Sequence, residues 1–367
     1  MAMSDLVKEN ICRLKPYSPG KPIEEVEREF GIKDIIKLAS NENPLGPSPK
    51  ALAAMKEALG KVALYPDGSC YYLKKALARH WGVGEDELLP GNGSDDLIHY
   101  IGVTFLSEGD GVIQANPSFV RYESASVLNS CNCTMVPLKD YTHDLEAMAD
   151  AIDDSTRLIF VANPNNPTGT AVTQKEVERF MARLPKKVIA VFDEAYYEYV
   201  ESPDYPRMYD YVRAGANVII LRTFSKIYAL AGLRVGYAIA RPEIIQCLNQ
   251  VREPFNVNSI AQAGALASLQ DAEQVERSKR VNSEGKRFLY REFERMGLPY
   301  APSEANFVFV DIKTDCRPVF TELLKRGVIV RTGDIFGYPT FFRVTIGTEA
   351  ENKRFIQALE EILDLRL

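Results

Sequence analysis

Residues 218–226 read Val-Ile-Ile-Leu-Arg-Thr-Phe-Ser-Lys, an apolar run that leads directly into two hydroxyl side chains and a lysine. The run is short, rich in β-branched residues and free of polar alternation, which is typical of a strand covered on both faces. Similar runs occur at residues 111–115, 158–162 and 188–193. Because helical patterns lie between them, this part of the chain predicts a doubly wound α/β domain with a mostly parallel sheet.

The rest of the chain predicts an N-terminal arm and a second, smaller domain. After about residue 255, long charged amphipathic helices are followed by separate strand patterns. We therefore expect an arm with part of the small domain at residues 1–47, a large domain at residues 48–258 and a small α/β domain at residues 259–367.

The charge and the apolar runs exclude several classes of partner. The chain of 367 residues has a net charge of -6 and no conspicuous Lys/Arg run. Nucleic acid and anionic membrane surfaces are therefore not expected as partners. The longest apolar runs are strand-sized, too short to span a bilayer, and the first ten residues do not resemble a signal peptide. We expect a cytoplasmic protein.

The cysteines and histidines do not predict a metal site. Of six cysteines, only Cys131 and Cys133 are close, and their spacing suits neither a zinc knuckle nor a redox pair. Free thiols are the expectation for a cytoplasmic chain. The three histidines, His80, His99 and His143, have no metal-ligand spacing. The chemistry is therefore expected from Lys, Asp, Tyr and Arg with an organic cofactor.

Polar residues follow two of the strands, where ligands bind in open parallel sheets. Asp193 ends one strand, and on position alone it could be a magnesium ligand, a cap or a cofactor contact. Thr223 and Ser225 are two residues apart, so in an extended segment both hydroxyls face the same side. Together with Lys226 and Arg234 they suit a phosphate, although a surface turn with solvated charges has the same composition. Largely uncharged surroundings favour the neutral, nucleophilic amine of Lys226.

Two loops offer further ligand contacts. Residues 91–96, Gly-Asn-Gly-Ser-Asp-Asp, precede an amphipathic helix, and free N–H groups at such a helix start bind anions. The loop is neither a Walker loop nor a dinucleotide fingerprint, which disfavours ATP and NAD. Residues 163–169 form a turn dense in Asn and Pro at another strand end. Each loop taken alone is also compatible with a plain connection.

These strand ends and helix starts together offer a phosphate cradle, an amine, a carboxylate and an amide. Pyridoxal phosphate needs all four, because it carries a phosphate, an aldehyde, a pyridine nitrogen and a phenolic oxygen.

The sequence resembles the fold type I aminotransferases over nearly the whole chain. The resemblance is carried by Asn-Asn-Pro-Thr-Gly at 165–169, Asp-Glu-Ala-Tyr at 193–196, Ser225-Lys226 and Arg234. It implies a large domain with a mostly parallel seven-stranded sheet between helices, and a smaller α/β domain. Within this superfamily the chain is similar to the histidinol-phosphate aminotransferases, through residues 14–23, 38–46, 65–68 and 223–226.

The resemblance also implies roles for individual residues around pyridoxal phosphate. Lys226 forms the internal aldimine, Asp193 pairs with the pyridinium nitrogen, and Asn166 and Tyr196 donate to the phenolic oxygen. Phe119 stacks on the ring, where many relatives have Tyr or Trp. The phosphate is held by the loop N–H groups and the hydroxyl and guanidinium groups already described: Gly93, Ser94, Asp95, Thr223, Ser225 and Arg234.

On the substrate side, Arg343 resembles the arginine that clamps the substrate carboxylate, and Arg331 a second anion contact. Tyr17 either closes over the substrate phosphate or anchors the arm on the core. Tyr65 resembles the tyrosine that reaches the phosphate of the neighbouring subunit, which implies a homodimer with shared active sites.

The resemblance implies a ping-pong transamination between histidinol phosphate and 2-oxoglutarate in histidine biosynthesis, with Lys226, Asp193 and Tyr196 as the catalytic residues. Two other enzymes share much of the pattern, an aromatic amino acid aminotransferase and a threonine-phosphate decarboxylase. A non-catalytic regulator is disfavoured, because the chain has no room for a DNA-binding domain and no basic helix to serve one.

Overall fold

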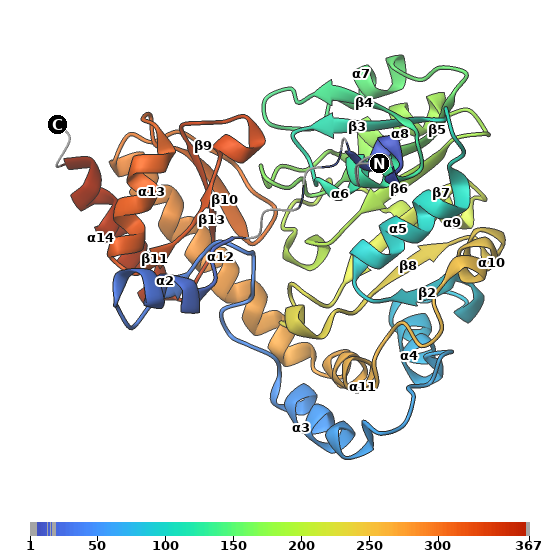
Figure 1. The fold of residues 1–367 in the computed structure, drawn as a ribbon, viewed down its shortest axis with the longest axis horizontal. Coiled ribbons are helices and arrows are strands. Elements are labelled where there is room, and N and C mark those ends of the chain that lie inside the picture. The colour runs from blue at the N-terminus through green and yellow to red at the C-terminus, as the bar shows by residue number, and fades with distance from the viewer. Residues whose placement is uncertain (1–5, 13, 15, 17–19, 365–367) are drawn as a thin grey trace.

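Figure 1 shows the chain as two α/β bodies joined by the long helix α12 (Ala272–Arg295). This computed structural model describes residues 6–12, 14, 16 and 20–364. Tyr17, predicted to contact the substrate, lies outside the described residues.

The larger body is built on a seven-stranded sheet in the order β2-β8-β7-β6-β5-β3-β4. Strands β3, β4, β5, β6 and β7 run parallel to one another, and β8 pairs antiparallel with both β7 and β2. The prediction of a mostly parallel seven-stranded sheet is therefore confirmed. The strands are β2 (Leu88–Gly91), β3 (Gly111–Asn116), β4 (Asn132–Pro137), β5 (Thr156–Ala162), β6 (Ile189–Asp193), β7 (Val218–Thr223) and β8 (Gly236–Ala240).

Helices cover both faces of this sheet, which explains why its strands are apolar throughout. In β5, Ile159 and Val161 join one core cluster, whereas Leu158 and Phe160 join the cluster on the opposite face. This alternation is the two-residue period of a strand buried on both sides. One face is covered by α3 (Pro49–Ala58), α4 (Tyr71–Trp81), α7 (Leu145–Asp150), α8 (Gln174–Arg183), α9 (Met208–Arg213) and α11 (Ser259–Ser268), and the other by α5 (Ser94–Phe105), α6 (Arg121–Leu128) and α10 (Pro242–Val251).

The smaller body has its own core around a four-stranded antiparallel sheet in the order β12-β13-β10-β9. A separate pair, β1 with β11, is parallel, so a strand of the N-terminal region belongs to this body. Its strands are β1 (Ile36–Lys37), β9 (Tyr300–Ala301), β10 (Phe307–Asp311), β11 (Val328–Ile329), β12 (Arg331–Thr332) and β13 (Phe341–Thr345), and its helices are α2 (Ile23–Phe30), α13 (Cys316–Lys325) and α14 (Glu349–Asp364).

The linking region between the two bodies includes α11 and α12. Helix α11, which the predicted boundary at residue 258 assigns to the small domain, contacts α3 and α4 of the larger body. Helix α12 contacts β10 and α14 of the smaller body. The boundaries at residues 47 and 258 stay predictions. In the part of the chain that the structure describes, no helix combines the length and the apolar character needed to cross a bilayer.

A buried ion pair joins the ends of β6 and β7. The guanidinium of Arg222 bonds Glu194 through Nε at 2.7 Å, and both side chains are almost completely buried. The same guanidinium lies 3.5 Å from the ring centroid of Tyr197 and 4.2 Å from that of Trp81. Because Glu194 follows Asp193 directly, this pair fixes the backbone next to the predicted site.

Removing one partner of this pair should destabilise the fold strongly. In Glu194→Ala the Arg222 charge stays buried without its counter-ion, which costs about 3–5 kcal/mol of unfolding free energy. Equilibrium urea unfolding measures this change. The matched control is Glu146→Ala, whose partners Arg179 and Arg183 are exposed, so its stability should stay near that of the parent. Equal stability of the two variants would contradict a stabilising role for the buried pair.

Candidate active site

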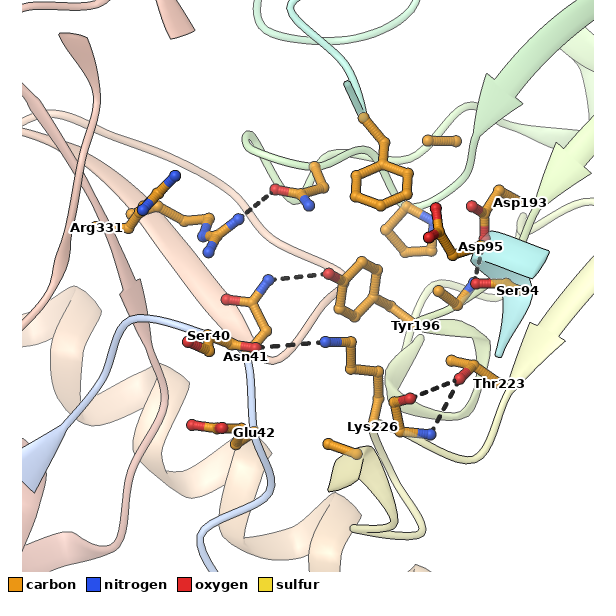
Figure 2. A pocket seen from close by; sticks show the side chains of 18 of the residues that line it. Ser40, Asn41, Glu42, Ser94, Asp95, Asp193, Tyr196, Thr223, Lys226 and Arg331 are labelled. Carbon is orange, nitrogen blue, oxygen red and sulfur yellow. Dashed lines mark hydrogen bonds between the residues drawn. The ribbon is translucent and has the colours of Figure 1, made fainter. Parts of the chain in front are cut away.

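A cavity of about 320 Å³ is lined by residues of both bodies, at the carboxyl ends of the parallel strands (Figure 2). The structure brings twelve of the predicted site residues to this cavity: Ser94, Asp95, Phe119, Asn166, Asp193, Tyr196, Thr223, Ser225, Lys226, Arg234, Arg331 and Arg343. Residues that are 249 positions apart in the sequence therefore meet in one place, as Ser94 and Arg343 do.

Lys226 extends into this cavity from the turn that follows β7. Its Nζ lies 3.4 Å from the backbone oxygen of Ser40 and 5.7 Å from the ring centroid of Tyr196. Desolvation in the cavity, reinforced by the positive charges of Arg343 and Arg234, lowers the pKa of Lys226 to about 8. A useful fraction of this amine is therefore neutral, and nucleophilic, near physiological pH.

Asp193 ends β6 and is buried beside the lysine. Its carboxylate accepts hydrogen bonds from the hydroxyl of Tyr122 at 2.8 Å and from the backbone N–H of Ala195 at 3.2 Å. Burial raises the pKa of Asp193 to about 6, and these bonds together with the positive charge of Lys226 oppose the rise. The carboxylate is therefore mostly ionised at neutral pH, as a partner for a cationic ring nitrogen must be.

The predicted anion cradle forms at the start of α5. Gly93 precedes the helix with a φ of 85°, and a Cβ there would lie 2.6 Å from Nη2 of Arg234, so only glycine allows the guanidinium so close. Arg234 reaches Ser225 Oγ at 3.4 Å, and Thr223 Oγ1 donates to Ser225 Oγ at 3.0 Å. A helix N-terminus, two hydroxyls and a guanidinium suit a phosphate group.

Gly236 and Arg121 make two further contacts next to this cradle. A Cβ at Gly236 would lie 2.9 Å from the backbone nitrogen of Ser94, so β8 packs closely against the start of α5. Arg121 Nε lies 2.5 Å from the carboxylate of Asp95. This ion pair offsets a negative charge that would otherwise repel a bound anion.

Tyr196 and Asn166 lie on the side of the cavity nearer the small body. The hydroxyl of Tyr196 accepts a hydrogen bond from Asn41 Nδ2 at 2.9 Å, and Asn166 Oδ1 accepts one from Arg343 Nη1 at 2.6 Å. Asn41 belongs to residues 38–46, a segment of the family resemblance to which the sequence analysis gave no role. Through this contact the segment reaches Tyr196 from the N-terminal region.

A buried polar network holds the Asn-Pro turn in place. Asn165 Oδ1 accepts from Ser118 Oγ at 2.9 Å, and Asn165 Nδ2 donates to Thr168 Oγ1 at 3.0 Å. His143 Nε2 lies 3.2 Å from the same Asn165 oxygen, and burial lowers the pKa of His143 to about 4. The turn that carries Asn166 is thereby tied to the segment that carries Phe119.

Two arginines from neighbouring antiparallel strands complete the cavity. Arg331 of β12 pairs in register with Arg343 of β13, and Figure 2 shows Arg331 on the far side of the cavity from Asp193. Arg343 is buried, and its Nη2 donates to the backbone oxygen of Ala39 at 2.7 Å. A second region of positive charge therefore faces the lysine, separate from the cradle.

Tyr65 does not line this cavity. Its side chain is 83% exposed and stacks on Phe255 with ring centroids 4.8 Å apart. Its reach to a neighbouring subunit stays a prediction. Among the described residues, no three His, Cys, Asp or Glu side chains gather as metal ligands do.

Fold and site together define an α/β enzyme with a nucleophilic amine, a buried carboxylate and an anion cradle at one sheet edge. The family model described as "Aminotransferase class I and II" matches residues 33–359, and the chain belongs to that family of pyridoxal-phosphate-dependent enzymes.

Several relatives carry the same, more specific name. A histidinol-phosphate aminotransferase of Moorella thermoacetica is 58% identical, over 97% of this chain and 92% of the relative. Another, of Caldicellulosiruptor saccharolyticus, is 48% identical over 98% and 100%. The crystal structure of histidinol-phosphate aminotransferase from Sinorhizobium meliloti in complex with pyridoxal-5'-phosphate superimposes with a TM-score of 0.91, at 29% identity and 98% coverage of both chains.

Titration of Lys226 tests the electrostatics of the cavity. Competitive labelling of the cofactor-free protein with acetic anhydride, followed by peptide mass spectrometry, measures the fraction of neutral Lys226 amine at each pH. Because the pKa of Lys226 is lowered to about 8, its labelling should approach its maximum by about pH 9, below the range of the exposed lysines. Arg343→Gln removes one of the repelling charges and should move the titration upward. A midpoint near the ordinary lysine value in the parent protein would contradict this electrostatic account.

Proposed function

We propose that the protein catalyses pyridoxal-phosphate-dependent transamination between histidinol phosphate and 2-oxoglutarate, which yields imidazole acetol phosphate and glutamate, a step of histidine biosynthesis. The observation that carries the proposal is the pair Arg331 and Arg343, which faces Lys226 across one cavity and is separate from the phosphate cradle. Each substrate of this reaction brings its own anionic group. The names of relatives 48–58% identical point to the same reaction.

When bound, pyridoxal phosphate supplies an aldehyde that reacts with amines and a ring that accepts electrons from the substrate α-carbon. The N–H groups at Gly93, Ser94 and Asp95, with Thr223, Ser225 and Arg234, would hold its phosphate. Phe119 would cover one ring face, as an aromatic ring without a polar handle. Asn166 and Tyr196 would donate to its phenolic oxygen.

Lys226 would move the proton of the substrate α-carbon, and Asp193 would hold a different proton, the one on the ring nitrogen. The amine of Lys226, freed when substrate binds, would remove the proton from the substrate α-carbon as a base and, as an acid, would deliver it to the carbon of the cofactor that carried the aldehyde. Its lowered pKa of about 8 suits both roles near neutral pH. Ionised Asp193 would keep the ring nitrogen of the bound cofactor protonated, the charge state in which the ring accepts electrons.

The two arginines account for the acceptance of two different substrates. The planar fork of Arg343 suits the α-carboxylate of glutamate, and Arg331 suits either the second carboxylate of glutamate or the phosphate of the other substrate. Tyr17 would close over that phosphate. An aromatic amino acid lacks this second anion, so its side chain would gain nothing from the positive charge of Arg331.

Kinetics of the purified enzyme test the substrate. With glutamate and imidazole acetol phosphate we expect release of 2-oxoglutarate, and Arg331→Ala should raise the KM for imidazole acetol phosphate on the order of tenfold or more, the worth of a hydrogen bond to a charged group. The KM for phenylpyruvate should change little. The matched control, Arg317→Ala, removes an exposed arginine that pairs with Asp334 outside the cavity.

Two results would overturn the substrate assignment. The first is no 2-oxoglutarate release together with fast turnover of phenylpyruvate, which would favour an aromatic amino acid aminotransferase. The second is release of carbon dioxide from threonine phosphate without transamination, which would favour the decarboxylase.

The protein is further proposed to be a homodimer in which Tyr65 completes the partner's phosphate site. Several large apolar side chains close to Tyr65 in the sequence are exposed, and Phe255 stacks on its ring. Exposed apolar surface is a mark of protein interfaces. These large exposed side chains are Leu59, Val62, Leu64, Tyr65, Tyr72 and Phe255. A cytoplasmic location is proposed as well, since all six cysteines are free thiols, as in reducing compartments.

Mixed dimers test whether Tyr65 acts across subunits. Lys226→Ala and Tyr65→Ala homodimers should each have little activity. In a hybrid of the two chains, one site combines an intact Lys226 with the intact Tyr65 of the other chain, so activity should return. If Tyr65 serves its own subunit, every site of the hybrid carries one defect and no activity returns. Hybrids that stay inactive would therefore contradict the shared site.

A further inference from the structure

Tyr122 lies in the first turn of α6, lines the cavity and is completely buried. Its ring stacks on Phe160 with centroids 4.7 Å apart and planes 6° apart, and meets the edge of Phe119 with centroids 5.6 Å apart. Its hydroxyl donates to Asp193 Oδ2 at 2.8 Å. One side chain thus touches both the ring-stacking residue and the carboxylate.

Packing alone does not account for the tyrosine. Phenylalanine would fill the same space beside Phe160 without burying a hydroxyl, and a buried hydroxyl is costly unless it is bonded. Here the hydroxyl has a charged acceptor. Burial and the neighbouring Asp193 charge raise the pKa of Tyr122 well above its ordinary value, so the phenol stays protonated and remains a donor.

We propose that Tyr122 is a positioning residue for the cofactor, and that its hydroxyl orients Asp193 and keeps this carboxylate ionised to face the protonated ring nitrogen. The inference rests on the proposed function in so far as that function requires pyridoxal phosphate.

The geometry around Asp193 supports this role. Ala195 N–H donates to Oδ1 and Tyr122 to Oδ2, so each carboxylate oxygen has its own donor and the plane of the carboxylate is fixed. A donor favours the charged form of a carboxylate, and here it opposes the effect of burial, which favours the neutral form. The stack with Phe160 fixes the phenol ring of Tyr122. The edge contact between Tyr122 and Phe119 then sets the position of the Phe119 ring. Cofactor stacking and the cofactor's charge partner are thereby positioned by one residue.

Substitution Tyr122→Phe removes only the hydroxyl. We expect its dissociation constant for pyridoxal phosphate, measured by titration of the cofactor-free protein, to rise about tenfold, because a hydrogen bond to a charged group is worth at least that factor. The kcat should fall by a similar factor. The KM for glutamate should stay within about twofold, since the substrate carboxylate binds Arg343 on another strand. In Asp193→Asn, adding Tyr122→Phe should cost no further affinity, because the charge that the hydroxyl serves is absent.

The matched control is Tyr237→Phe, which removes another buried hydroxyl of the larger body, from strand β8. Tyr237 accepts a hydrogen bond from Trp81 Nε1 at 2.7 Å and lies outside the cavity. This variant should lose thermal stability yet keep cofactor affinity and kcat within about twofold of the parent. Similar affinity for Tyr122→Phe and Tyr237→Phe would overturn the proposal. So would an equal loss on adding Tyr122→Phe to the parent and to Asp193→Asn.

If Tyr122→Phe fails to fold, Phe160→Leu provides the test, since it keeps every polar atom and removes the ring that orients Tyr122. A severalfold loss of cofactor affinity is then expected, and parent-like affinity would overturn the proposal. These affinity measurements need no amino-group substrate. A failure of the histidinol-phosphate assignment would therefore leave them intact, whereas a parent protein that does not bind pyridoxal phosphate would refute the proposed function itself.

Discussion

The parallel order of β5, β6 and β7 is the constraint on which the site depends. Because these strands run in one direction, Asn163, Asp193 and Thr223 follow or end them at the same sheet edge. Backbone hydrogen bonds across this edge, from Asn163 N–H to Asp193 O and from Glu194 N–H to Leu221 O, continue the sheet into the turns. These hydrogen bonds hold the backbone of the turns in place, and the turns position the functional side chains.

Each buried charge at this edge lies near other charges or hydrogen-bond donors that shift its protonation. Burial favours the neutral form of Asp193, but two hydrogen bonds and Lys226 favour its ionised form. Lys226 in turn loses its proton more easily, since desolvation and two nearby guanidinium groups disfavour its positive charge. Behind them, the Arg222–Glu194 pair lies between aromatic rings and stabilises the backbone next to Asp193. The surrounding fold thus sets the protonation states that the proposed chemistry requires.

Sequence patterns could predict the part of this site that lies at strand ends. Asp193 and Lys226 come at the ends of strand patterns, and the loop at residues 91–96 precedes a helix pattern. The rule that ligands bind at the carboxyl ends of parallel strands therefore places them together. Arg331 and Arg343 lie on short antiparallel strands of the other body, and only the family resemblance gave them a role. The structure brings both to the same cavity.

Tyr122 and Asn41 could not be predicted in the same way. Tyr122 is one of several apolar or aromatic residues on a helix, and its contact with Asp193 spans 71 positions. Asn41 reaches Tyr196 across 155 positions, from a segment without a chemical signature of its own. Such contacts follow from how helices and loops pack on the sheet, and no local pattern in the sequence encodes them.

The central claim is that one sheet edge holds a single cofactor through Lys226, Asp193 and the cradle at Arg234. A crystal structure of the protein, after incubation with pyridoxal phosphate and reduction with borohydride, tests it most directly. The account predicts continuous density from Lys226 Nζ to the cofactor, with its phosphate at Ser225 and Arg234 and its ring nitrogen at Asp193. Cofactor attached to another lysine, or a ring nitrogen that faces away from Asp193, would contradict it.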